Sequence, residues 1–269
     1  VAALVAFALM YGGIYAVIGS ILLVAFLFFQ FTRIHKKREK NEVNDEEILI
    51  NSEHDVVVNA TQQIEQAVAT TIEVYQGVLD GLFKEDRKNL SKLYKIADEF
   101  HGKCKRQRAY EVLPTLQRLN QASLDTGQYY VQAVDYSYEI SVSLRYITKS
   151  GYDFIDNAHE GFSKEQIEDL KELGGSFIAA FREYTDMIKN NDYSGLEKIK
   201  ERRAGILDLY SELVKKQIKR TKEKETGSRN SILYLNILNE TKIIAMKSAN
   251  LMRAQMNLYN SDDFNKISD

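Results

Sequence analysis

A single proline in 269 residues constrains this chain more than any other feature of its sequence. Proline is the residue that most strongly ends a helix, and Pro114 stands alone, with long stretches free of proline on both sides. Apolar residues in those stretches recur with the 3.6-residue period of a helix, and the strict alternation of a half-buried strand is absent. We therefore expect an all-α protein that is built from long helices.

Apolar stripes and turn signals divide residues 52–260 into six expected helices. The predicted helices span about 52–83, 86–112, 116–160, 163–190, 196–224 and 231–259. Ser163 followed by Gln166 has capping-box spacing and opens the fourth helix, whereas the second is expected to stop before Pro114. Long helices with short connections form an elongated antiparallel bundle. The third and sixth helices carry the fewest charges, so we expect them at its centre.

Residues 1–31 differ from the rest, because none of them is Asp, Glu, Lys, Arg or His. One helix of that length would measure about 46 Å, which exceeds the hydrocarbon core of about 30 Å. Gly12 and Gly13 form a turn signal, so residues 1–10 are predicted to end one span and 14–31 to form the last one. One long, tilted helix is the alternative. The run starts with Val and lacks the layout of a signal peptide, so we expect the C-terminal fragment of a longer membrane protein.

A basic cluster follows the apolar run at once and consists of Arg33, Lys36, Lys37, Arg38 and Lys40. Lysine and arginine beside a span mark its cytoplasmic end and also attract anionic lipid headgroups; we favour the role in topology. Residues 32–51 then form a linker, residues 52–260 the bundle and residues 261–269 a frayed end. We expect a multi-pass protein of the inner (plasma) membrane, with the bundle in the cytoplasm.

The single cysteine, Cys104, agrees with a reducing compartment and allows no internal disulfide. Its basic neighbours, Lys103, Lys105 and Arg106, would lower the pKa of its thiol, although an incidental thiol is the simpler interpretation. The formal net charge of −2 provides no overall field that would attract nucleic acid. We therefore expect no nucleic-acid partner.

No catalytic motif stands out in the sequence. The four histidines are scattered, and the chain lacks zinc-ligand spacing, phosphate-binding glycine loops and a nucleophile elbow. We therefore expect a protein that is not an enzyme.

Two pairs of carboxylates are better candidates for a binding site. Asp135 and Glu139 are four residues apart in an apolar, aromatic segment, and Asp208 and Glu212 repeat that spacing. Residues four apart share a helix face, where two like charges repel each other. A hard cation such as Mg²⁺ or Ca²⁺ would offset this repulsion. Ion pairs are the alternative that we favour, with basic partners among Arg145, Lys242 and Arg253.

Three segments resemble a known family. The stretch "ALMYGGIYAVIGSILLVAFLFF", with "HKKREK" after it, resembles the last transmembrane hairpin of bacteroidete-type PiT inorganic phosphate transporters. The segments "VQAVDYSYEISVSLRYI" and "LNILNETKIIAMKSANLMRAQ" resemble the PhoU-like C-terminal domain that such transporters carry. The resemblance covers essentially the whole chain, and it contains no short diagnostic motif.

The resemblance implies a secondary transporter that moves inorganic phosphate together with Na⁺ or H⁺. It also implies a cytoplasmic bundle of two three-helix units that regulates transport or senses state. PhoU-like proteins hold divalent or trivalent metal ions with acidic E(D)xxxD motifs. The pairs Asp135/Glu139 and Asp208/Glu212 match that spacing, but each ends in Glu where the motif has Asp.

The resemblance assigns no transport residue, because the substrate site of PiT transporters would lie in earlier membrane helices. The expected partners are the membrane and, through a transport domain outside the printed sequence, inorganic phosphate. A homo-oligomer is left open. The alternatives are Na⁺/phosphate cotransporters that carry PhoU-like domains, and a membrane-anchored cytoplasmic bundle for signalling or scaffolding.

Overall fold

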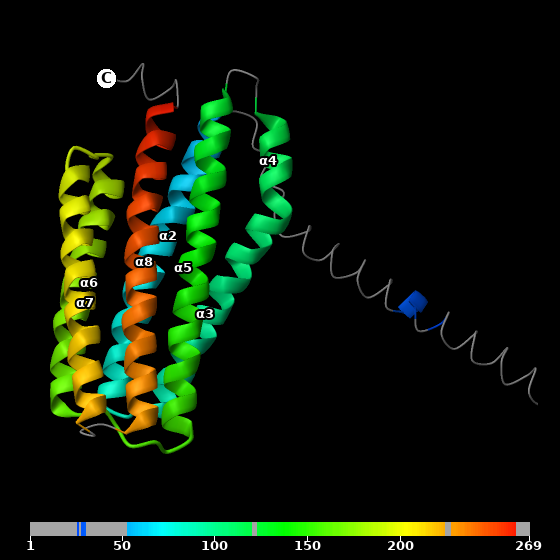
Figure 1. The fold of residues 1–269 in the computed structure, drawn as a ribbon. Coiled ribbons are helices and arrows are strands. Elements are labelled where there is room, and N and C mark those ends of the chain that lie inside the picture. The colour runs from blue at the N-terminus through cyan, green and yellow to red at the C-terminus, as the bar shows by residue number, and fades with distance from the viewer. Residues whose placement is uncertain (1–25, 27, 31–52, 120–122, 224–226, 262–269) are drawn as a thin grey trace, which may run out of the picture. The chain divides into compact units, whose positions relative to one another are not determined.

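The computed structural model describes residues 26, 28–30, 53–119, 123–223 and 227–261. The chain divides into two compact units, Val1–Leu49 and Ile50–Asp269. Within its described residues the second unit contains seven α-helices, one π-helical segment and no strand (Figure 1). The expected all-α fold is therefore confirmed for this unit.

The predicted helices correspond closely to six of those observed. In chain order the α-helices are α2 (Glu53–Phe83), α3 (Arg87–Arg106), α4 (Val112–Arg118), α5 (Leu124–Asp156), α6 (Lys164–Asn190), α7 (Leu196–Lys222) and α8 (Ser228–Ser261). The predicted capping box is present at the start of α6. The Ser163 side chain accepts a hydrogen bond from the backbone N–H of Gln166, and the Gln166 side chain accepts one from the backbone N–H of Ser163.

The helix around Pro114 differs from the prediction. It does not stop before the proline, because a π-helical segment, η1 (Gln107–Glu111), joins α3 to α4, and α4 contains Pro114. Pro114 has no backbone N–H, so the carbonyl of Tyr110 cannot receive the usual i→i+4 hydrogen bond. π-Helix occurs mostly as a single turn inside an α-helix, and here it precedes the proline without ending the helix. The predicted stop was wrong, and the third predicted helix, expected from about 116, begins only at Leu124 because residues up to Arg118 belong to α4.

The bundle consists of two halves. Helices α2, α3 and α5 pack together as the first half, and α6, α7 and α8 as the second half. The most extensive contact between any two of the described helices is that of α5 with α8, so these two form the seam between the halves (Figure 1). The central position that their low charge predicted is confirmed.

One apolar core runs through both halves. The rings of Tyr75 on α2 and Phe177 on α6 lie 4.1 Å apart between their centroids. The hydroxyls of Tyr75 and Thr241 on α8 share a buried hydrogen bond of 2.7 Å. Helix α2 is therefore joined to the second half by both an aromatic and a polar contact.

A second, smaller apolar cluster closes the end of the bundle at which α2 begins and α8 ends; we call this the linker end. The cluster contains Val56, Val57, Ala60, Tyr130, Val134 and Leu258. Beside it, the Ser123 hydroxyl donates to the Glu53 carboxylate at 2.7 Å. The Thr126 hydroxyl also donates to Glu53 and lies 2.8 Å from the Ser261 Oγ atom. The first turn of α2 is thus tied to the start of α5 and the last turn of α8.

Candidate functional site

Asp135 and Glu139, the first predicted carboxylate pair, lie partly exposed on α5. The Asp135 Oδ1 atom is 2.7 Å from the Nε atom of Arg108 on η1, and Glu139 forms an ion pair with Lys247 on α8. The Arg108 guanidinium also lies 4.7 Å above the centre of the Tyr138 ring. Each carboxylate therefore has a basic partner, which offsets the repulsion between them.

Asp208 and Glu212, the second predicted pair, lie exposed on α7. Glu212 forms an ion pair of 2.8 Å with Lys216, one turn further along the same helix. Two of the basic residues expected to pair with these carboxylates have other contacts. Arg145 pairs with Asp98, and the Lys242 ammonium lies over the Tyr210 ring.

A metal site at these carboxylates stays a prediction. Across the described parts of the chain, no three or more side chains of His, Cys, Asp or Glu come close enough together to hold a metal ion. The two pairs lie on different halves of the bundle. Each pair therefore offers two carboxylates, and Asp135, Glu139 and Glu212 already have basic partners.

The predicted membrane segments, 1–10 and 14–31, lie outside the described residues, apart from four positions near the end of the second. Those four are helical, and the Phe26, Phe28 and Phe29 side chains are exposed. The basic cluster (Arg33, Lys36, Lys37, Arg38, Lys40) is also outside the described ranges. None of the helices that the structure describes is both long and apolar enough to cross a membrane.

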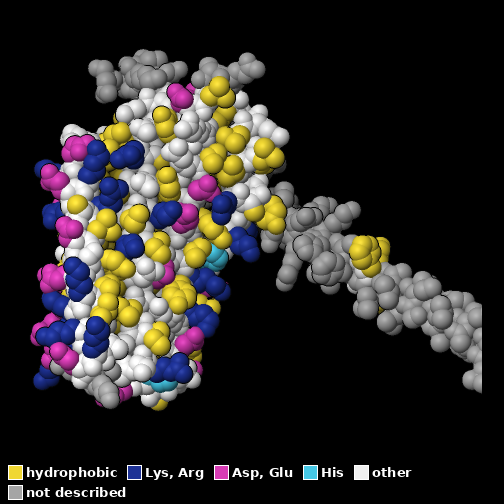
Figure 2. Space-filling model, in the orientation of Figure 1, with side chains coloured by type: hydrophobic (Ala, Val, Ile, Leu, Met, Phe, Trp, Pro, Cys, Tyr) yellow, Lys and Arg dark blue, Asp and Glu magenta, His cyan; other side chains and the backbone are white. Residues whose placement is uncertain are grey.

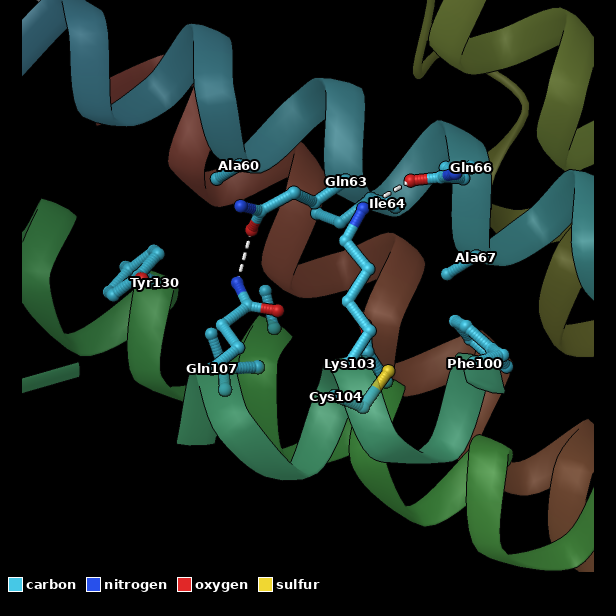
Figure 3. Close-up of a pocket in the computed structure, with 13 residues that line it drawn as sticks. Ala60, Gln63, Ile64, Gln66, Ala67, Phe100, Lys103, Cys104, Gln107 and Tyr130 are labelled. Carbon is cyan, nitrogen blue, oxygen red and sulfur yellow. Dashed lines mark hydrogen bonds between the residues drawn. The ribbon is translucent and has the colours of Figure 1, made fainter. Parts of the chain in front are cut away.

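A small cavity lies between α2, α3 and α5, beside η1 (Figure 3). At its rim the Lys103 ammonium donates to the Gln66 side chain at 2.5 Å, and the Gln107 amide donates to Gln63. Its volume is about 20 Å³, which is room for about one water molecule. The cavity is therefore too small for an organic ligand.

Cys104 lines this cavity and is buried. Burial raises the pKa of its thiol to about 11, and a hydrogen bond with Ser141 and the charge of Lys103 lower it only in part. The expected activation by neighbouring cations is therefore outweighed by desolvation. His101 shares a hydrogen bond of 3.2 Å with Ser141, and burial together with the Arg145 charge lowers the pKa of the imidazole. The Cys104 thiol is therefore poorly suited to act as a nucleophile, and the His101 imidazole is poorly suited to act as its charged partner.

A wider groove lies between α2 and α6, with a volume of about 280 Å³. The two helices are close together there. A Cβ atom added at Gly174 would lie only 2.7 Å from the Leu79 side chain. The groove contains two basic residues of α6, Lys171 and Arg182. They are three helical turns apart, or about 16 Å along the axis, so their charges do not converge on one small anion.

The second half contains a buried ionic cluster that sequence reasoning missed. The Oδ2 atom of Asp169 on α6 accepts hydrogen bonds from the Arg220 guanidinium on α7 at 2.7 Å and from the Tyr234 hydroxyl on α8 at 3.0 Å. The Asp169 and Arg220 side chains are only 10% and 14% exposed. Burial, followed by the Asp169 charge, raises the pKa of Tyr234. No local signal marks Asp169, because its partners are 51 and 65 residues away.

Polar side chains extend this cluster toward the start of α6. The Gln166 amide donates to Gln217 on α7 at 3.1 Å, and the Gln217 amide donates to the Ser231 hydroxyl on α8 at 3.0 Å. Gln166 is also the residue whose oxygen completes the capping box. Gln166 thus links the first turn of α6 to α7, and Gln217 extends that link to α8.

Comparison with known proteins relates the bundle to two crystal structures. The phosphate transport system regulatory protein PhoU from Streptococcus pneumoniae has a TM-score of 0.62 and 14% sequence identity, with 77% of this chain and 96% of that chain covered. PhoU from Pseudomonas aeruginosa has a TM-score of 0.64 and 11% identity, with 78% and 99% covered.

At the level of sequence, the chain matches no family model and no curated protein. The likeness to the two PhoU structures, at such low identities, is therefore one of fold. The fold class expected for the bundle, a PhoU-like arrangement of helices, is confirmed.

Proposed function

We propose that this bundle regulates the transport of inorganic phosphate across a membrane. The observation that carries the proposal is the fold that it shares with the two PhoU structures, one of them named as the regulatory protein of a phosphate transport system. The overlap covers nearly all of both PhoU chains, so the whole regulatory fold has its counterpart here.

We further propose that the bundle is attached to the transporter that it regulates, and that this transporter is of the PiT type. The uncharged residues 1–31, and the basic cluster between them and the bundle, support a cytoplasmic bundle tethered to the inner membrane. The resemblance of the sequence to PiT transporters supports inorganic phosphate as the substrate and Na⁺ or H⁺ as the coupling ion.

The linker end offers a physical route for such regulation. Glu53 is the first residue of α2, and its carboxylate accepts hydrogen bonds from Ser123 and Thr126 at the start of α5. Thr126 in turn contacts Ser261 in the last turn of α8. A rearrangement of the seam between α5 and α8 would therefore reach the residue at which the linker joins the bundle.

The test is phosphate uptake by the full-length protein in cells that lack their own phosphate transporters. We expect uptake, and we expect its initial rate to depend on the phosphate supply during growth. Deletion of residues 53–261 should keep the uptake and remove that dependence. Absence of uptake by the intact protein would overturn the attachment to a transporter and favour a signalling or scaffolding bundle. An unchanged dependence after the deletion would overturn the regulatory role.

A further inference from the structure

An exposed apolar surface lies on the last two residues of α3, on η1 and on α4, which together we call the arm (residues 105–118). Tyr110 on η1 is 52% exposed and Leu113 on α4 is 64% exposed. Leu124, the first residue of α5, is 75% exposed. Figure 2 shows apolar side chains gathered over this upper part of the bundle. Large apolar side chains grouped on a surface usually mark a contact site.

The arm packs against the bundle with its other side. Gln107 and Thr115 are buried, and Val112 and Leu119 pack against the apolar cluster at the linker end. The inner side of the arm is therefore covered by the bundle. The outer side, with Tyr110 and Leu113, has no such cover among the described residues.

Basic residues accompany the exposed apolar side chains. Residues 103–118 contain five of them and a single acidic residue, Glu111. Arg108 is engaged with Asp135, and the exposed Lys105 and Arg106 lie about one helical turn before Tyr110. The arm thus carries positive charge next to its exposed apolar side chains. Asp125 is the acidic residue next to Leu124.

We propose that the outer face of the arm binds the surface of an anionic lipid bilayer. Apolar side chains at the centre of an amphipathic helix enter the boundary between headgroups and acyl chains, and basic residues pair with anionic headgroups. Tyrosine is favoured at that depth, because its ring is apolar and its hydroxyl polar.

The position of the arm in the fold supports this occupant, and here the inference rests on the proposed membrane attachment. The arm belongs to the linker end, where α2 begins at Glu53. Residues 32–52, between the predicted span and α2, reach at most about 75 Å when extended. A bilayer that holds residues 14–31 is therefore within reach of the arm.

Charge argues against a second copy of the chain on the same face. A symmetric pair of arms that used this face would place Lys105 and Arg106 of both copies in one interface. Like charges placed close together oppose association. An anionic lipid surface complements both residues.

The chain contains no tryptophan, so one introduced tryptophan reports its own surroundings. We would insert the full chain with Leu113→Trp into vesicles of phosphatidylcholine and phosphatidylglycerol whose acyl chains are brominated. The matched control is Ile218→Trp, because Ile218 is 48% exposed and lies near the end of α7 that is remote from the linker end. We expect bromine to quench the Leu113→Trp emission and to leave the Ile218→Trp emission unchanged.

Removal of the basic residues is the second part of the experiment. Lys105→Gln and Arg106→Gln, each combined with Leu113→Trp, should lower the lipid-bound population about fivefold per charge removed. Vesicles of phosphatidylcholine alone should lower it further. Leu124→Trp replaces Leu113→Trp if the latter disturbs the helical circular dichroism signal.

Three results would overturn the proposal. The first is equal quenching of Leu113→Trp and Ile218→Trp. The second is quenching that does not respond to phosphatidylglycerol or to Lys105→Gln and Arg106→Gln. The third is emission that is shielded from iodide but not quenched by bromine, which would indicate a protein partner or a second copy.

Alkaline extraction of the same vesicles separates this inference from the proposed function. If the chain stays in the membrane but its tryptophan is not quenched, lipid binding by the arm is wrong and the proposed membrane attachment stands. If alkali extracts the chain, the proposed attachment is wrong. Flotation of the extracted chain with phosphatidylglycerol vesicles would then still support lipid binding by the arm.

Discussion

The two halves of the bundle contain similar helices and are stabilised differently. In the second half, α6, α7 and α8 meet at a buried carboxylate, Asp169, which is shared by a guanidinium and a hydroxyl. In the first half the interhelical ion pairs are solvent-exposed, as between Arg108 and Asp135, and the second helix changes to a π-helical turn before Pro114. The comparison suggests that the second half is a fixed support, whereas the first half presents surface for contacts.

The largest expected effect comes from breaking the buried cluster of the second half. Asp169→Ala leaves the Arg220 guanidinium without its carboxylate, and removal of one partner of a buried ion pair costs about 3 kcal/mol. The matched change in the first half is Asp135→Ala, whose ion pair is exposed and worth about 1 kcal/mol or less. Urea unfolding would measure both. Equal losses of stability would remove the distinction between the halves.

The cavity of the first half gives the next prediction. A thiol pKa of about 11, against an ordinary value of 9.0, makes the Cys104 thiolate about a hundredfold rarer at pH 8 than in the unfolded chain. Alkylation by iodoacetamide should be slower by at least that factor in the native protein. Because folding raises this pKa, the thiol favours the native state below pH 9, and that contribution is lost as the pH rises toward 11. Rapid alkylation at pH 8 would show that this part of the first half opens easily.

The contact between the halves gives a smaller effect. Tyr75→Phe removes the hydroxyl that bonds to Thr241 and should cost about 1 kcal/mol, since the Thr241 hydroxyl keeps its bond to the Ile237 carbonyl. Tyr146→Phe is the control, because Tyr146 is exposed and accepts one bond from Asn236. Thermal unfolding should rank the two variants in that order, and the reverse order would contradict the account of the core.

The smallest effect on stability is expected at the arm. Leu113→Ser exchanges a side chain that is 64% exposed, so the free energy of unfolding should change by about 0.5 kcal/mol or less. A loss as large as that of Asp169→Ala would mean that the arm is part of the core and not a contact surface.

Local signals in the sequence were sufficient for most of the helices. The Ser163 capping box depends on four consecutive residues, so it was readable and is present. The central place of α5 and α8 followed from their low charge. The passage of the helix through Pro114 was not readable, because its π-helical turn coincides with packing of Gln107 against α2, which is remote in sequence.

The candidate site was less predictable than the fold, because ion pairs depend on which helices meet. The carboxylates of Asp135 and Glu139 were recognised as needing positive partners, but Arg108 and Lys247 were not identified. The environment of Asp169 required three helices to be placed together before it could be recognised.

Our central proposal is that the bundle controls phosphate transport through its linker end. The most direct measurement is the initial rate of phosphate uptake by the full-length protein with a flexible glycine-serine insertion after Lys40, compared with the unmodified protein after growth at low and high phosphate. The account predicts that the insertion keeps the uptake and abolishes its dependence on phosphate supply. A dependence that survives the insertion unchanged would contradict it.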